Sequence, residues 1–164
     1  MNYFEFYDLK PGFILDEQVL KKKFLESSRL YHPDHFVLNS ETEQTHSEEQ
    51  SAYNNRAYKI LSHTDSRLKY LLELKNAVHD EEVYTLGQDF LMEMLDLNDL
   101  ILEDPANATA QLNSMEQELY NEIWPILKSY DHDQVSIDDL NLLKDYHYKK
   151  RYILRIRENL NKRN

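Results

Sequence analysis

Residues 25–36, LESSRLYHPDHF, contain the feature that decides the fold, which is the tripeptide His32-Pro33-Asp34. Proline cannot occupy a helix interior, and it biases the residue before it toward an extended backbone. The tripeptide therefore predicts a loop. Because segments with helical periodicity lie on both sides of it, this loop is expected to join two helices at an exposed tip.

The two flanking segments are predicted to be amphipathic helices that form a hairpin. Upstream, Asp16 is a candidate N-cap, and downstream Ser47-Glu48-Glu49-Gln50 has the pattern of a capping box. The apolar stripes consist of Leu20, Phe24, Ser27 and Tyr31 in the first helix and of Ala57, Tyr58 and Leu61 in the second. Lys21, Lys22 and Arg29 point away from the first stripe, so the hairpin is expected to have a basic outer face.

The composition favours a helical protein without thiol chemistry. The chain has 164 residues, enough for one medium domain or two small ones, and its 2 Gly and 4 Pro argue against a loop-rich or all-β fold. It contains no cysteine, which excludes disulfides, thiolate metal sites, cysteine-ligated iron–sulfur clusters and cysteine nucleophiles. No run approaches the length of a membrane span and the first residues do not resemble a signal peptide, so a cytoplasmic protein is expected.

Charge is distributed unevenly along the chain. The net charge is −11, but residues 144–164 hold 8 Lys and Arg against 2 Asp and Glu, a net +6, so the preceding residues hold −17. An acidic body disfavours general nucleic-acid binding. The basic end fits either contact with an acidic partner or solvated cations that suit the last turns of a helix.

Periodicity, caps and breakers predict an all-α fold in two parts. Helices are expected near residues 3–8, 17–31, 47–62, 65–74, 89–103 and 106–130, and from an N-cap at Ser136 to about residue 161. Pro125 should kink or split the sixth of these helices. The expected domains are residues 1–75, a polar connection over 76–88, and a three-helix bundle over 89–164.

The segment 89–103 is predicted to have two apolar faces. At 100° per residue, one narrow sector holds a core stripe of Phe90, Met94, Leu97 and Ile101. A second sector, roughly 120° away, holds Leu91, Leu95 and Leu102, with Met92 beyond them and Asp96 and Asp99 at its edge. A helix of a small bundle needs only one apolar face. The second face therefore indicates a docking surface, unless it packs on a neighbouring helix or on the first domain.

The hairpin around the tripeptide resembles the J domain of Hsp70 co-chaperones. Residues 3–9 are similar to the short first helix of that domain, Asn55-x-Ala57-Tyr58-x-x-Leu61 to its third helix, and Arg67-x-x-Tyr70-Leu71-Leu72 to the start of its fourth. Over nearly its whole length the chain resembles, more narrowly, the Hsc20/HscB-type J proteins of iron–sulfur cluster assembly, in the bacterial form without a Cys-rich N-terminal module. Its segment DFLMEMLDL, residues 89–97, is similar to the opening of the second domain in that family.

This resemblance implies a function and two sets of site residues. A co-chaperone of this family recruits the iron–sulfur cluster scaffold protein to a specialised Hsp70 and stimulates the Hsp70 ATPase. It is not itself an enzyme, needs no cofactor or metal, and binds neither nucleic acid nor membrane. The implied Hsp70-binding residues are His32, Pro33, Asp34, Lys21, Lys22 and Arg29. The implied scaffold-binding residues are Leu91, Met92, Leu95, Asp96, Asp99, Arg151 and Tyr152.

Several residues depart from the pattern of the family. His35 stands where lysine is common, so docking on the Hsp70 is expected to be weaker or sensitive to pH. Asn54 occupies a core position that is usually aliphatic, where a buried amide needs hydrogen-bond partners. Asp96 and Asp99 stand for glutamate and Tyr152 for phenylalanine, changes that keep charge and aromatic character but shorten the acidic side chains.

Three other functions are open on the sequence alone. One is a J-domain co-chaperone of a general Hsp70 with a different client, which would not need the second face of residues 89–103. Another is an HD-type metal phosphohydrolase, whose candidate ligands would be His79-Asp80, His132-Asp133, or His32, Asp34 and His35. The third is nucleic-acid or membrane binding by residues 144–163, where Tyr146, Tyr148 and Tyr152 interleave with Lys149, Lys150 and Arg151.

Overall fold

The computed structural model describes residues 1–162, which form helices and loops without a β-strand. The elements are α1 (Tyr3–Phe6), α2 (Glu17–Leu30), the 3-10 helix η1 (Pro33–Phe36), α3 (Glu41–Leu61), α4 (Thr64–Leu74), α5 (Gln88–Glu103), α6 (Pro105–Lys128) and α7 (Ile137–Asn161). Contacts divide the chain into two compact units, Met1–Leu71 and a second that begins at Leu72, so α4 crosses the division. The all-α fold expected from the sequence is confirmed. Residues 163–164, the end of the predicted second domain, lie outside the described residues.

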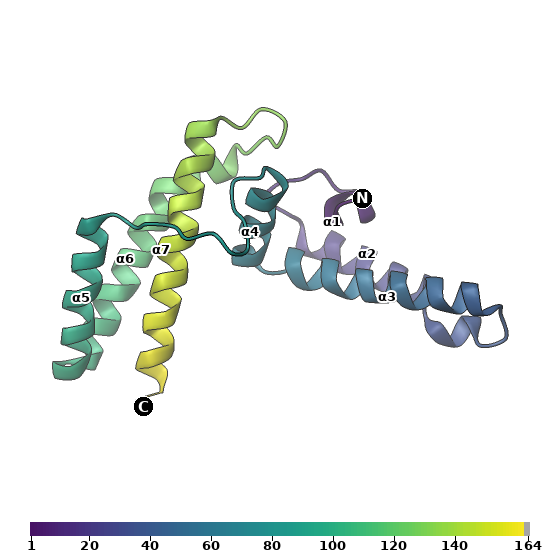
Figure 1. Cartoon of the computed structure of the whole chain (residues 1–164), viewed down its shortest axis with the longest axis horizontal. Coiled ribbons are helices and arrows are strands. Elements are labelled where there is room, and N and C mark those ends of the chain that lie inside the picture. Colours follow the sequence, from purple (N-terminus) through teal and green to yellow (C-terminus); the bar gives the residue numbers. More distant parts are fainter. Residues whose placement is uncertain (163–164) are drawn as a thin grey trace. The chain divides into compact units, whose positions relative to one another are not determined.

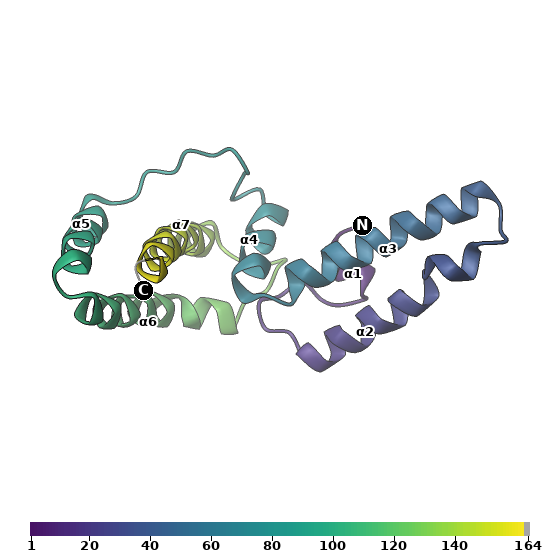
Figure 2. The same cartoon turned by 90° about the horizontal axis from the view of Figure 1, so that it is seen from below.

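In the first unit, α2 and α3 form an antiparallel hairpin with η1 at its tip (Figure 1, Figure 2). Asp16 caps α2 as predicted, because its carboxylate accepts hydrogen bonds from the N–H groups of Gln18 and Val19. The Phe24 ring stacks on Tyr58 of α3 with ring centroids 4.2 Å apart. The buried side chains of this unit include Phe4, Tyr7, Leu20, Ala57, Leu61 and Leu68.

The α3 helix begins at Glu41, whereas the sequence analysis placed its start at residue 47. Ser40 is the N-cap: its hydroxyl accepts from the Glu43 N–H at 3.4 Å, and the Glu43 carboxylate accepts from the Ser40 N–H at 3.1 Å. Ser47 therefore lies inside α3 and is fully buried, so the predicted capping box at residues 47–50 is wrong. The reason is that Ser40-x-x-Glu43 carries the same signal and directly follows the loop.

In the second unit, α5, α6 and α7 pack around one hydrophobic cluster. The cluster contains Phe90, Met94, Leu97, Ile101, Ala108, Leu112, Ile153, Ile156 and Leu160. The four residues predicted to form the core stripe of α5 are therefore buried, and Ser136 caps α7 as predicted. Pro125 does not split α6, which continues to Lys128. Because Pro125 lies in the last turn, only three helical residues follow it, and its carbonyl accepts from the Ser129 hydroxyl at 2.7 Å.

Glu82 and Tyr84, in the predicted connection, are held against α7. The Glu82 carboxylate contacts the Lys144 ammonium and accepts from the Tyr148 hydroxyl at 3.0 Å. These hydrogen bonds, chiefly that from Lys144, lower the pKa of Glu82. The Tyr84 ring stacks on Tyr148 with centroids 4.5 Å apart and an angle of 9° between the rings, and its hydroxyl donates to Asp145 at 2.9 Å. This part of the connection therefore packs as part of the second unit.

Candidate functional site

The His-Pro-Asp loop forms a short 3-10 helix that begins at Pro33. His32 is its N-cap and has the extended backbone that the proline predicted, with φ −67° and ψ 124°. The Asp34 N–H donates to Nδ1 of His32 at 3.3 Å, and the His35 N–H donates to the His32 carbonyl at 3.0 Å. Because Nδ1 accepts this bond, the neutral imidazole carries its proton on Nε2. The loop thus has internal hydrogen bonds that do not depend on a partner.

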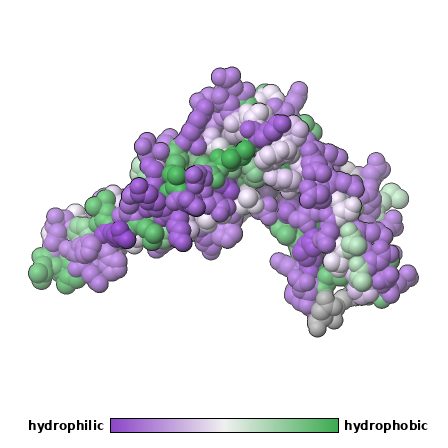
Figure 3. All heavy atoms as spheres, turned by 180° about the vertical axis from the view of Figure 1, so that it is seen from behind, coloured by the Kyte–Doolittle hydropathy of each residue, from purple (hydrophilic) through white to green (hydrophobic). Residues whose placement is uncertain are grey.

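The side chains of this loop face solvent. The His32 side chain is 54% exposed and that of Asp34 is 83% exposed, and Nδ1 of the first lies 3.6 Å from Oδ2 of the second. The His35 ring lies 5.8 Å from that of His32. Val37 and Leu38 are also exposed, and hydrophobic residues reach the surface at the tip of the hairpin (Figure 3). The predicted tripeptide is therefore presented at an accessible tip.

Two side chains of α3 hold the ends of the loop, and neither was predicted to belong to the site. The Ser47 hydroxyl donates to the Tyr31 carbonyl at 3.0 Å, and this serine is fully buried. The Gln44 side-chain amide donates to the carbonyls of Val37 and Asn39 at 3.2 and 3.0 Å, in an exposed position. The earlier helix start is the signal that could have found them, because it places both residues beside the loop.

The exposed side of α2 carries the three predicted cations. Lys21, Lys22 and Arg29 are exposed and line one shallow surface groove. Leu25 lies among them, and its 42% exposure adds an apolar contact surface that was not predicted from the sequence. Lys22 lies 4.0 Å from Glu26, an exposed pair that contributes little to stability. A basic face therefore leads along α2 toward the loop.

The α5 helix exposes the second apolar face that its periodicity predicted. The exposed residues of this face are Met92, Leu95, Asp96, Asp99 and Leu102, whereas Leu91 is half-buried. The exposed fractions of Met92, Leu95 and Leu102 are 64%, 61% and 66%. Three apolar side chains on one helix thus remain in solvent although the core stripe of the same helix is buried.

Of the two predicted residues on α7, Tyr152 contacts the first turn of α5. The Tyr152 ring meets Phe90 edge-on, with centroids 6.0 Å apart and an angle of 81°. Arg151 is exposed, and its guanidinium lies 5.8 Å from the centre of the Tyr148 ring. Because Leu91 directly follows Phe90, Tyr152 lies beside the first turn of the α5 face. The two acidic residues of the surface, Asp96 and Asp99, lie further along α5.

The described residues offer no metal site. Among residues 1–162, no three His, Cys, Asp or Glu side chains are grouped so that they could hold a metal ion. His132, from one of the His-Asp pairs, shares a hydrogen bond with the Tyr130 hydroxyl at 3.0 Å, and burial, with the charge of Lys75, lowers the pKa of His132. The HD-type alternative therefore has no ligand set in this part of the chain. Over the same residues, no helix is both long and apolar enough to cross a membrane.

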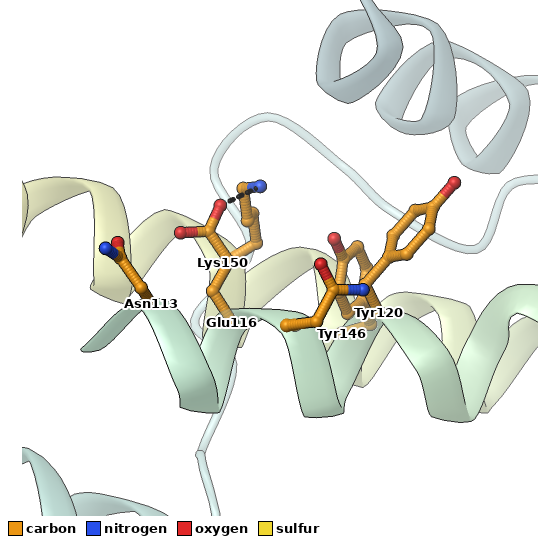
Figure 4. Close-up of a pocket in the computed structure, with 6 residues that line it drawn as sticks. Asn113, Glu116, Tyr120, Tyr146 and Lys150 are labelled. Atoms are coloured by element: carbon orange, nitrogen blue, oxygen red, sulfur yellow. Dashed lines mark hydrogen bonds and ion pairs between the residues drawn. The ribbon is translucent and has the colours of Figure 1, made fainter. Parts of the chain in front are cut away.

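A pocket of about 300 Å³ lies between α6 and α7 (Figure 4). Its lining consists of Asn113, Glu116, Gln117, Tyr120, Tyr146 and Lys150, and includes no residue predicted to bind an Hsp70 or a scaffold. The Glu116 carboxylate accepts from the Lys150 ammonium at 2.5 Å and also contacts Arg157. The charges at the pocket are therefore paired within the protein, and they join α6 to α7.

The chain combines a helical hairpin, which has an exposed His-Pro-Asp tip and a basic face on its first helix, with three packed helices that follow in sequence. This combination defines a J-domain co-chaperone. Similarity to known proteins narrows this class. Residues 86–161 match the family model described as the HSCB C-terminal oligomerisation domain. The chain is 33% identical over 143 residues to a co-chaperone protein HscB homologue of Vibrio vulnificus strain YJ016, a match that covers 76% of this chain and 84% of the relative.

Two solved structures have the same fold. The crystal structure of human co-chaperone protein HscB matches with a TM-score of 0.82 and 27% identity, over 99% of this chain and 82% of the human one. The chaperone HscB from Vibrio cholerae matches with a TM-score of 0.71 and 25% identity, over 99% and 96%. The chain belongs to the HscB family of co-chaperones. This confirms the resemblance drawn from the sequence and its general function, a co-chaperone of iron–sulfur cluster assembly that works with an Hsp70.

Proposed function

We propose that this chain stimulates the ATPase of a specialised Hsp70 through His32, Pro33 and Asp34, and recruits the iron–sulfur scaffold protein to it. The observation that carries the proposal is the exposed loop with its own hydrogen bonds. A loop that is already ordered loses less conformational entropy on binding than a flexible one. The Asp34 carboxylate, 83% exposed, is accessible to an arginine of the Hsp70, and such charge-assisted bonds are strong.

The cations on α2 support the same docking mode. Lys21, Lys22 and Arg29 are exposed on the helix that leads to the loop. Such charges at the rim of an interface act chiefly on the association rate by steering an oppositely charged partner. Stimulation of the Hsp70 should therefore weaken as ionic strength rises. His35 supplies a further positive charge only when it is protonated.

The proposed scaffold-binding surface is the exposed side of α5 together with Arg151 and Tyr152. The exposure of Met92 and Leu95 supports this role, because the bundle already buries a separate apolar stripe of the same helix. The remaining members of the surface are Leu91, Asp96 and Asp99. An apolar centre with acidic neighbours fits a partner whose apolar patch is flanked by cations.

Single-turnover ATP hydrolysis by the Hsp70 of the same organism tests the proposal. The reaction is run with this chain, with its His32→Gln variant, and with this chain and the scaffold protein together. We expect stimulation by the chain, amplification by the scaffold, and a return to the basal rate in the variant. Circular dichroism is the control, because the variant should retain its helicity.

The outcomes separate the two parts of the proposal. Stimulation without any effect of the scaffold would retain the J-domain role and give the chain a different client of a general Hsp70. A variant that stimulates as well as the unchanged chain would contradict the role of the loop, and so would a chain that stimulates no Hsp70. The predicted cytoplasmic location is tested separately by cell fractionation.

A further inference from the structure

Two buried polar side chains of α3 face α2 in the first unit. Ser47 is 0% exposed and Asn54 is 1% exposed. A buried polar group destabilises the folded state unless it is hydrogen-bonded, and both of these side chains are hydrogen-bonded. Apolar contacts between the two helices, such as the stacking of Phe24 on Tyr58, are less directional than hydrogen bonds.

The partners of these side chains are backbone carbonyls of α2 and of its C-cap. The Ser47 hydroxyl donates to the Tyr31 carbonyl at 3.0 Å, and the Asn54 amide donates to the Phe24 carbonyl at 3.2 Å. The amide also donates to the Ser28 hydroxyl at 2.9 Å. The two donors are seven positions apart on α3, and the two carbonyls are seven positions apart, in the reverse order, on α2.

This spacing means that one antiparallel register satisfies both hydrogen bonds. A shift of α2 along α3 by a single residue is about 1.5 Å, which would lengthen or misalign both bonds at the same time. The buried donors would then be poorly satisfied, and water does not reach them easily. The Ser47–Asn54 pair therefore adds directional constraints on the axial register of the hairpin to those of the apolar packing.

We propose that Ser47 is a positioning residue for the His-Pro-Asp loop, with Asn54 as the second anchor of the register. Tyr31 is the C-cap of α2 and directly precedes His32, whose carbonyl and ring carry the hydrogen bonds of η1. The bond from Ser47 thus sets the point in space at which the loop begins. This inference rests on the proposed function of the loop in stimulating an Hsp70.

The test is Ser47→Ala in the full chain, with Ser51→Ala as the matched control. Ser51 lies one turn further along α3 and is half-buried. Alanine favours the helix at both positions, so both variants should fold. The amide resonances of Tyr31, His32, Asp34, His35 and Phe36 are followed by NMR, and stimulation of the Hsp70 is measured as a function of co-chaperone concentration. A role in fold stability alone would lower resistance to urea without moving these resonances.

We expect Ser47→Ala to shift the loop amides and to raise the half-saturating concentration for stimulation about threefold to tenfold, the range that one lost hydrogen bond explains. Ser51→Ala should change neither the loop amide resonances nor the half-saturating concentration. Unshifted loop amides would overturn the inference, and so would shifted amides with unchanged stimulation. If the unchanged chain stimulates no Hsp70, the proposed function fails, while the resonances still decide whether Ser47 positions the loop.

Discussion

The side-chain amide of Asn54 joins three segments of the first unit. Its oxygen accepts from the Tyr7 hydroxyl at 2.7 Å, in addition to the two bonds that its nitrogen donates to α2. Burial raises the pKa of Tyr7 well above its usual value, so the hydroxyl remains a donor at neutral pH. The amide is tolerated at an otherwise apolar position because both of its donors and its acceptor are used.

Asn54→Ala is expected to lower the free energy of unfolding by about 2–3 kcal/mol. The substitution leaves the Tyr7 hydroxyl without its side-chain partner and opens a small cavity beside Ser28. Urea unfolding followed by circular dichroism measures the change. Asn55→Ala is the control, because this neighbour on α3 is exposed and should change stability by less than about 0.5 kcal/mol. Equal effects of the two substitutions would contradict the network.

For single residues, rules based on neighbouring sequence predicted the His-Pro-Asp loop but not the hydrogen bonds of Asn54 and Ser47. The loop and the extended backbone of His32 follow from Pro33, which acts on its immediate neighbours. The partners of Asn54 are 26 to 47 residues away in the sequence. Ser47 likewise bonds a carbonyl 16 residues away. Bonds between distant segments depend on how the helices pack, so no local pattern indicates them.

Among the elements, α5 was the most predictable and α3 the least. Periodicity alone separated the buried stripe of α5 from its exposed face, because the rotation of 100° per residue is a property of every helix. The start of α3 was wrong because two capping signals lie seven residues apart and polar residues fill the turns between them. Arg151 and Tyr152 came only from the family resemblance, since no periodicity relates α7 to α5.

Glu116 joins α6 to α7 through ion pairs with Lys150 and Arg157. Burial alone would raise the pKa of this carboxyl, but the hydrogen bonds and charges of the two cations outweigh it and lower the pKa. A pKa below the unfolded value means that ionised Glu116 stabilises the fold above about pH 4.5. The stabilisation is lost as the pH falls through the lowered pKa.

Glu116→Gln is therefore expected to reduce the free energy of unfolding by about 1 kcal/mol at pH 7. The difference from the unchanged chain should shrink as the pH falls below about 4.5 and through the lowered pKa, because the carboxyl then becomes protonated in the folded state as well. Denaturant unfolding at a series of pH values measures this. Glu122→Gln, at an exposed position of α6, is the control and should have little effect at any pH. A difference for Glu116 that does not change with pH would contradict the ionic role.

At the scale of the whole molecule, the two proposed binding surfaces lie in different compact units. Leu91→Ala combined with Leu95→Ala is expected to weaken scaffold binding at least about tenfold, because two apolar contacts are removed. Basal stimulation of the Hsp70 should be retained, since the His-Pro-Asp loop is untouched. Isothermal titration with the scaffold protein and ATPase assays without it measure the two effects.

Leu142→Ala is the matched control for this double variant. Leu142 is 55% exposed on α7, outside the proposed scaffold surface, so its truncation should leave scaffold affinity unchanged. Unchanged affinity in the double variant would count against the α5 face. Loss of stimulation in a folded double variant would show that the two surfaces are not separate in function.

The overall architecture was the easiest feature to predict, and its internal boundaries the hardest. Helical periodicity and the few glycines and prolines indicated an all-α chain, which the structure confirms. The domain division at residues 1–75, 76–88 and 89–164 remains a prediction. Composition marks residues 76–88 as polar, but it does not reveal that Glu82 and Tyr84 pack on α7.

The packing of Glu82 and Tyr84 constrains where this protein can be recombined with others. A gene fusion that joins a foreign J domain at residue 88 would inherit α5, α6 and α7 but would lose the contacts that Glu82 and Tyr84 make with Lys144, Asp145 and Tyr148. A junction at residue 72 would carry those partners along. The folding unit that a fusion must preserve is thus longer than α5, α6 and α7. Fusion proteins should keep the stability of this unit only when the junction lies before Glu82.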